Sequence, residues 1–162
     1  MTLVLSELRE LLEAEDLRYY LIPDQDGVFL TMKGEFNKYQ FKILSELDGE
    51  FVQLRSIDYL QCPQGHPNLD VTLQVLGEIN YRLRLVKFGW DPADGEIAVY
   101  VDAWIVDATV TQGMFHRMWN AFVSIMDDEY PRLKAAIEDG VGLQGTDGSE
   151  APDPDDDLVE SL

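Results

Sequence analysis

The sequence contains one cysteine and two histidines among its 162 residues, and this scarcity argues against several kinds of chemistry. Cys62 has no second cysteine for an internal disulfide, so a reducing compartment such as the cytoplasm is the expected setting. Cys62 and His66 are four residues apart, but a structural zinc site takes four ligands, and the other histidine, His116, lies far along the chain. A Cys–His catalytic pair also needs a reachable base and an orienting group. We therefore predict no metal, no cofactor and no thiol catalysis.

Basic residues are also few, with 12 Lys and Arg against 31 Asp and Glu and a formal net charge of −19. A field of that sign repels phosphate backbones and anionic lipid surfaces, so nucleic acid and membrane are excluded as expected partners. Residues 141–162 hold no base and seven of the acids, namely Asp147, Glu150, Asp153, Asp155, Asp156, Asp157 and Glu160. Residues 1–140 therefore keep 24 acids and 12 bases, a charge of −12.

Long hydrophobic runs are absent as well. No stretch of about 18 apolar residues occurs, and the apolar segment of residues 97–101 is followed directly by Asp102. Glu7 and Glu10 interrupt the N-terminal region where a secretory signal needs an unbroken apolar stretch. What the chain does have is 46% hydrophobic and 10% aromatic residues, enough for the core of one packed domain.

Hydrophobic periodicity predicts an α+β domain. Residues 3–15 repeat leucine at spacings of three and four, as an amphipathic helix does. Residues 18–57 are runs of β-branched and aromatic residues cut by turn dipeptides, which predicts a four-stranded antiparallel meander with a two-residue type I′ turn at Asp48-Gly49. Asn68 is the expected N-cap of a second helix over residues 68–82. Asn80 interrupts the apolar face of this helix, and we expect a bond to nearby backbone or a helix-edge position in preference to a ligand contact.

Two further strands flank the turn residues 91–95, and a third helix is expected after Thr109 or Thr111. Pro131 lies inside this helix and should kink it or split it in two. The order α-ββββ-α-ββ-α predicts an antiparallel sheet with packed helices in one domain, residues 1–140. Residues 141–162 are predicted to form a disordered acidic tail. The G-x-G-x-x-G string at residues 140–145 follows a helix, which is the wrong context for a dinucleotide site.

Two aromatic residues on the last strand are the first candidates for an interface. The aliphatic residues Ile97, Val99 and Val101 alternate with Tyr100 and Trp104, which therefore lie on the opposite face of the strand. Such aromatics often anchor protein interfaces, although ordinary packing in a second layer is the more common explanation. Leu73 and Leu76 form the apolar edge of the second helix. We take Tyr100, Trp104, Leu73 and Leu76 as the candidate surface for a partner or a second copy.

The segment of residues 76–133 resembles the YbjN-like family of bacterial sensory transduction regulators. The residues that carry the resemblance are Glu78-Ile79-Asn80, Gly89-Trp90, Asp94-Gly95, Val106-Asp107 and Asp128-Glu129-Tyr130-Pro131. With the N-terminal helix and meander in the expected order, the resemblance covers about residues 3–140 and leaves out the tail. It implies a fold like that of the type III secretion chaperones, small α+β proteins that dimerise and bind segments of other proteins. It offers no catalytic residues to carry over.

These observations predict a non-enzymatic module, chaperone-like or regulatory, that binds another protein or a peptide segment in the cytoplasm and forms a homodimer. An acidic body suits a basic or apolar segment, because complementary charge speeds encounter. One alternative is a small hydrolase or transferase with an unidentified carboxylate site. Two of the 31 acids could act as general acid and base, and the sequence alone does not identify which two. Another is an acidic decoy that occupies the basic surfaces of nucleic-acid-binding proteins.

Overall fold

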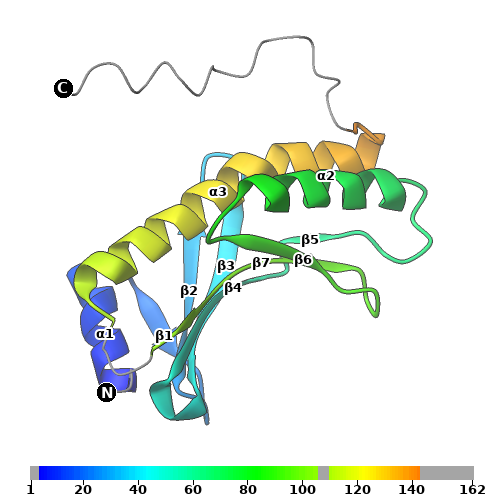
Figure 1. Ribbon diagram of the computed structural model, residues 1–162. Coiled ribbons are helices and arrows are strands. Elements are labelled where there is room, and N and C mark those ends of the chain that lie inside the picture. The colour runs from blue at the N-terminus through cyan, green and yellow to red at the C-terminus, as the bar shows by residue number, and fades with distance from the viewer. Residues whose placement is uncertain (1–3, 106–109, 143–162) are drawn as a thin grey trace, which may run out of the picture.

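The computed structural model describes residues 4–105 and 110–142. Its elements are α1 (Leu5–Ala14), β1 (Tyr19–Leu21), β2 (Gly27–Lys33), β3 (Lys38–Glu46), the 3-10 turn η1 (Leu47–Gly49), β4 (Phe51–Ile57), β5 (Leu60–Gln61), α2 (Leu69–Arg82), β6 (Lys87–Trp90), β7 (Glu96–Trp104) and α3 (Gln112–Asp139). The helices lie on one side of a curved antiparallel sheet (Figure 1). This confirms the predicted α+β class. The one strand not expected, β5, is two residues long and therefore too short to show alternation.

The seven strands form one antiparallel sheet in which β1, β2, β3, β4 and β7 are successive neighbours. Tyr100 of β7 pairs with Arg55 of β4 on one side and with Lys87 of β6 on the other. The short β5 continues along the β4 side of β7, after a break at Asp58, whose φ is 49°. The sheet therefore has β1 at one edge and β6 at the other.

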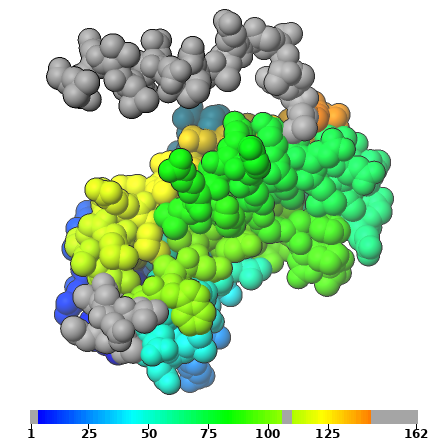
Figure 2. All heavy atoms as spheres, viewed as in Figure 1, coloured from blue at the N-terminus to red at the C-terminus, as the bar shows by residue number. Residues whose placement is uncertain are grey.

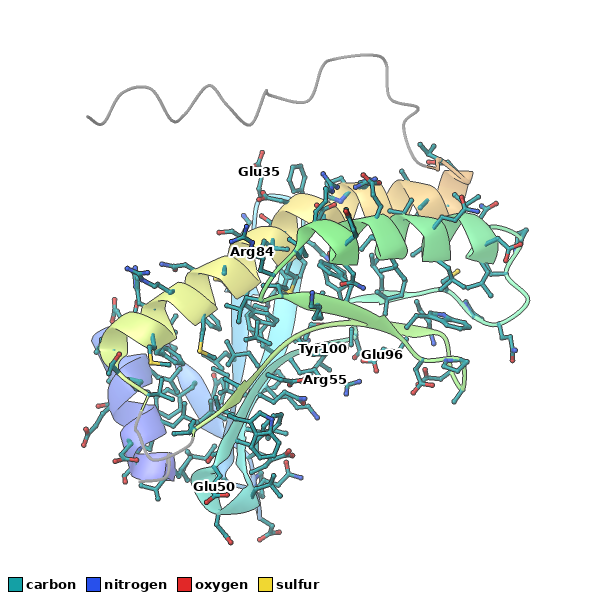
Figure 3. All side chains as sticks on the ribbon, viewed as in Figure 1. Glu35, Glu50, Arg55, Arg84, Glu96 and Tyr100 are labelled. Atoms are coloured by element: carbon teal, nitrogen blue, oxygen red, sulfur yellow. The ribbon has the colours of Figure 1, made fainter. Side chains whose placement is uncertain are left out.

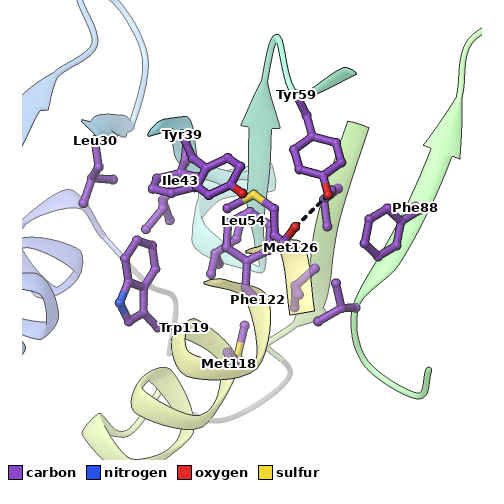
Figure 4. Close-up of a cluster of buried hydrophobic side chains, with 14 of the residues drawn as sticks. Leu30, Tyr39, Ile43, Leu54, Tyr59, Phe88, Met118, Trp119, Phe122 and Met126 are labelled. Atoms are coloured by element: carbon purple, nitrogen blue, oxygen red, sulfur yellow. Dashed lines mark hydrogen bonds between the residues drawn. The ribbon is translucent and has the colours of Figure 1, made fainter. Parts of the chain in front are cut away.

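The core lies between the helices and the face of the sheet that carries the aliphatic residues of β7. Those residues, all fully buried, are Ile97, Val99 and Val101. From α3, Phe122 and Met126 are fully buried, and Trp119 is 5% exposed. Figure 4 shows Trp119 and Phe122 in this core. Their rings meet the ring of Phe41 edge-on, with centroids 5.5 and 5.6 Å away. The alternation on β7 thus assigned its core face correctly.

The turn between β3 and β4 falls at Asp48-Gly49 as predicted, but the connection is four residues long, 47–50, and not the two that were expected. Both residues have positive φ, 55° and 84°, and Glu50 N donates to Leu47 O at 3.1 Å across the turn. Glycine and aspartate adopt this region at least cost, which is why the dipeptide occurs here. The last paired residues of β3 and β4 are Glu46 and Phe51. Leu47 and Glu50 do not pair, because Leu47 also has a positive φ, 52°.

The second helix begins where predicted, but the side chain of Asn68 does not cap it. Its Nδ2 donates instead to Ile137 O near the end of α3, at 2.9 Å, and so joins the two helices. Asn80 bonds to backbone as expected: its Nδ2 donates to Phe88 O at 2.7 Å and its Oδ1 accepts from Phe88 N at 2.8 Å. Asn80 therefore acts as one more hydrogen-bonding partner for the edge strand β6, and its place on the apolar face has a structural reason.

Pro131 was predicted to kink the third helix or to split it in two, and the split does not occur. Thr111 caps α3, accepting from Met114 N at 3.2 Å, and the helix continues for 28 residues through Pro131. Pro131 is exposed, so its ring lies on the solvent side of α3 and not against the core. The helix ends at Gly140, whose φ is 67° in the left-handed region that favours glycine at this position.

A carboxylate of α3 holds the loop between β2 and β3. Asp127 Oδ2 accepts from Glu35 N at 2.7 Å, and its Oδ1 accepts from Phe36 N at 3.2 Å and from the Tyr39 hydroxyl at 2.5 Å. A Cβ at Gly34 would overlap this carboxylate, so the approach requires glycine. Burial alone would raise the pKa of Asp127, but the hydrogen bonds from Tyr39 and the two amides outweigh it, and that pKa is lowered.

The predicted tail falls almost wholly outside the described residues, which include only Val141 and Gly142 of residues 141–162. Its disorder therefore stays a prediction. Within residues 4–105 and 110–142, no helix combines the length and the apolar character needed to cross a bilayer.

Candidate functional site on the open face of the sheet

The face of the sheet opposite the core is not covered by any helix of the described residues, and we call it the open face (Figure 1). On β7 it carries the residues that alternate with the aliphatic core row. Figure 3 shows Tyr100 there, close to Arg55 of β4 and Glu96 at the start of β7. The sequence prediction that Tyr100 and Trp104 lie opposite the core row is therefore correct, and the structure brings further side chains to them.

Trp104 is the most exposed aromatic on β7, with 65% of its surface accessible. The register of β4 and β7 makes Phe51 its Cα partner, and the two rings lie 5.2 Å apart between centroids, tilted by 59°. Phe51 is itself only partly buried. Together they form an apolar patch at the end of the sheet next to the Asp48-Gly49 turn. An exposed tryptophan supported by a second ring is the kind of group that dominates binding energy at protein interfaces.

Tyr100 lines a separate cleft on the same face, with a volume of about 300 Å³. Its walls include Arg55, Trp90 and Glu96. Arg55 Nη2 lies 2.8 Å from Glu96 Oε2, an ion pair that is partly exposed. A Cβ at Gly89 would lie 3.0 Å from the Tyr100 ring, so glycine at this position makes room for that ring beside β6. The cleft thus combines aromatic walls with one cation, Arg55, and two acids, Glu96 and Asp91. Its lining residues include no nucleophile paired with a base.

Leu73 and Leu76 do not join this surface, because α2 lies on the other side of the sheet. Leu73 is 36% exposed on the outer side of α2, where Tyr81 is 91% exposed. Leu76 is only 4% exposed and belongs to the core. The four residues selected from the sequence therefore occupy three places: the open face, the outside of α2 and the interior. The spacing of apolar residues in α2 could not show that Leu73 is exposed and Leu76 buried, since both lie near the edge of the buried side of the helix.

The residues considered for metal or catalytic chemistry have structural partners. Cys62 is fully buried, with its thiol 3.8 Å from the Thr72 hydroxyl. His116 is exposed on α3, where its Nδ1 lies 2.8 Å from Glu15 Oε2 of α1. The hydrogen bond with His116 is the main reason that the pKa of Glu15 is lowered. Among the residues that the structure describes, no group of three or more His, Cys, Asp or Glu side chains could hold a metal ion.

Sequence reasoning missed Phe51, Arg55 and Trp90. The alternation in residues 51–57 does place Phe51, Gln53 and Arg55 on one face of their strand, which was the available signal. What it does not contain is the pairing of β4 with β7. Arg55 and its partner Tyr100 are 45 residues apart in the sequence and meet only in the folded sheet. Trp90 precedes the Pro92 loop, and its indole Nε1 donates to Cys62 O at 2.8 Å.

The structure defines a small α+β domain in which helices cover one face of the sheet and leave the other open. Residues 5–135 match the model of the YbjN family, described as "Putative bacterial sensory transduction regulator". The chain belongs to the YbjN family. No curated protein matches the sequence.

Three solved structures share the fold. One is described as "YbjN, a putative transcription regulator from E. coli"; it has 13% identity and a TM-score of 0.58, and the match covers 83% of this chain and 94% of that one. The ExsC–ExsE complex gives 16% identity and a TM-score of 0.51, covering 82% and 97%. The HopA1–SchA chaperone–effector complex gives 12% and 0.50, covering 75% and 88%. At such identities the likeness concerns the fold alone, and it confirms the predicted chaperone-like α+β class.

Proposed function

We propose that this protein is a non-enzymatic, chaperone-like or regulatory module of the cytoplasm that binds a segment of another protein on the open face of its sheet. The observation that carries the proposal is Trp104, 65% exposed and supported by the ring of Phe51. An apolar surface of this kind is costly to leave in water, and on folded domains such surfaces commonly mark interaction sites. The cleft beside Tyr100 offers room for a side chain of the same partner.

Two further observations support a protein partner. The structures described as ExsC–ExsE and as a HopA1–SchA chaperone–effector complex share this fold, and both are complexes between proteins. The charge of −12 in residues 1–140 disfavours nucleic acid and favours a partner segment that is apolar or basic. Affinity would come mainly from the aromatic residues, and the charge would act mainly on the rate of association.

Affinity capture from the native cytosol, with quantitative identification of the bound proteins, tests the proposal. Trp104→Ala should reduce recovery of a specific partner at least tenfold, since truncating an anchoring tryptophan typically costs about 2 kcal/mol or more. Phe36→Ala is the matched control, because Phe36 is an exposed aromatic, 49% accessible, in the loop between β2 and β3. A partner set that is the same for wild type and Trp104→Ala contradicts the assignment of the open face.

We also propose that the protein forms a homodimer through the outer side of α2. Leu73 and Tyr81 are exposed there, and α2 forms a broad part of the surface in Figure 2. Sedimentation equilibrium of the full chain should show a dimer. Leu73→Glu should weaken it at least tenfold, whereas Gln74→Glu, an exposed residue one position along the same helix, is the matched charge control. A mass that stays monomeric at every concentration, or equal effects of both substitutions, rejects this interface.

A further inference from the structure

The cleft beside Tyr100 is hollow because two small residues face each other inside it. Gly89 of β6 and Ala98 of β7 are Cα partners, and both line the cleft. The Tyr100 ring lies beside Gly89, since a Cβ on that glycine would be 3.0 Å from it. The volume of about 300 Å³ is at the low end of what small-molecule pockets have. The cleft is therefore the size for one long side chain of a partner.

The rim of this cleft carries more acid than base. Asp91 and Glu96 line it with one cation, Arg55, which is already paired with Glu96 at 2.8 Å. Asp91 N donates to Glu96 O at 2.9 Å, so the two acids lie across the β6–β7 hairpin from each other, where like charges repel. Asp58 and Asp94 line the adjoining hollow, which shares Glu96 with the cleft. Four acids and one base therefore surround the two hollows, and a cationic group fits between them.

The acceptors around the cleft favour a guanidinium. Asp91 Oδ2, Glu96 Oε1 and the Tyr100 hydroxyl make no hydrogen bond with any residue that the structure describes. A guanidinium offers five N–H donors in a planar fork and also stacks on aromatic rings, whereas a lysine ammonium is a compact point charge. Figure 3 shows the Tyr100 ring close to Glu96, so one planar cation can reach both.

We propose that the cleft receives an arginine of the partner segment whose apolar side chain packs on Trp104 and Phe51. This inference rests on the proposed function and specifies the partner that it needs. Ala98 is six residues from Trp104 along β7, about 20 Å at about 3.4 Å per residue. An extended partner covers that distance in six residues, and an even spacing keeps both side chains on one side of it. The partner segment therefore carries a bulky apolar residue and an arginine six residues apart.

Charge complementarity decides the sign of the residue in the cleft. Residues 1–140 carry −12, which attracts a basic segment and repels an acidic one before contact. Exposed ion pairs contribute little affinity by themselves, so the arginine mainly supplies selectivity. Most of the affinity comes from apolar contact with Trp104 and Phe51. A free arginine should accordingly bind weakly, and a segment that also covers Trp104 should bind more tightly.

Titration of the ¹⁵N-labelled full chain with N-acetyl-arginine amide tests the cleft without any partner. Amide signals of Arg55 and of residues 89–91 and 96–100 should move together along one saturable curve. N-acetyl-citrulline amide has the same shape without the charge and should bind about tenfold more weakly, because hydrogen bonds between charged groups are the stronger ones. Shifts that do not saturate, or that are equal for both probes, overturn the inference.

Variants test which groups hold the probe. Asp91→Asn leaves the ion pair of Glu96 in place and should weaken the arginine probe about threefold, the effect of one exposed charge pair. Tyr100→Leu removes the stacking surface and should also cost about threefold. Asp102→Asn is the matched control, because Asp102 is an acid on the same face of β7 that does not line the cleft. Equal effects of Asp91→Asn and Asp102→Asn attribute binding to net charge alone and reject the cleft.

Two synthetic peptides test the spacing. Each contains one leucine and one arginine among serine and threonine residues, six positions apart in one peptide and three in the other. The first should bind about tenfold more tightly than the second and than N-acetyl-arginine amide, since only it adds burial of the leucine. Trp104→Ala should remove that advantage. Equal binding of the two peptides, or of the first peptide and the free amide, contradicts the inference.

The result is distinguishable from that of partner capture. Capture that depends on Trp104, together with no binding of the arginine probe, refutes this inference and leaves the proposed function in place. Capture that does not depend on Trp104 refutes the proposed function itself.

Discussion

Replacing Asp127 with asparagine should destabilise the protein by about 2 kcal/mol at pH 7. The carboxylate accepts three hydrogen bonds, from Glu35 N, Phe36 N and the Tyr39 hydroxyl. Asparagine retains one acceptor oxygen, so the donor that faces its NH₂ group is left without a partner, and the charge that strengthened the other bonds is lost. One bond to a charged group contributes about 1.5–3 kcal/mol. Denaturant unfolding should show a lower midpoint with an unchanged slope.

The stability difference between wild type and Asp127→Asn should depend on pH. The pKa of Asp127 is lowered in the folded protein, so its contribution is present above the unfolded value of about 3.9 and is lost as pH falls through the folded pKa. The gap between wild type and Asp127→Asn should therefore shrink below about pH 4. Asp128→Asn is the matched control, an exposed neighbour for which we expect a change within about 0.5 kcal/mol.

Two results would refute the reasoning. One is an Asp127→Asn midpoint at pH 7 equal to that of Asp128→Asn. The other is a gap that stays constant from pH 7 to about pH 2.5. Hydrogen exchange of the Glu35 and Phe36 amides measures the local effect. Both amides should exchange faster in Asp127→Asn if the loop between β2 and β3 detaches before the domain unfolds.

Three further outcomes follow from the packing. Asn80→Ala should cost about 2–3 kcal/mol in thermal unfolding, because both backbone groups of Phe88 lose a partner, while Gln74→Ala on the exposed side of α2 should change little. Gly77→Ala should stabilise by about 0.5–1 kcal/mol, since nothing lies within 4 Å of its new Cβ, whereas Gly95→Ala should destabilise, because its φ is 82° and its Cβ would meet Pro63. Phe122→Ala should cost about 3–5 kcal/mol by denaturant unfolding, and a cost below about 1 kcal/mol would contradict the central place of this ring in the core.

The parts of the fold that were predictable are those set by neighbours along the chain. Alternation assigned the core face of β7, leucine spacing located α1 and α2, and Asp48-Gly49 specified the hairpin turn. Asn80 bonds to backbone as expected, although the particular strand that it serves was not foreseeable. Pro131 shows the limit of such rules, because its cost depends on whether the freed carbonyl faces solvent, and that is decided by how α3 packs.

The candidate site divides in the same way. The sequence by itself determined that Tyr100 and Trp104 lie opposite the core row, that the protein is strongly acidic, and that cysteine and histidine are too few for the usual metal and thiol sites. Only the tertiary structure decided that Phe51 supports Trp104, that Leu76 is interior, and that Arg55 lines the cleft beside Tyr100. The physical reason is that periodicity reports which side of its own element a residue occupies, whereas register and layer order depend on contacts between strands and helices distant in sequence.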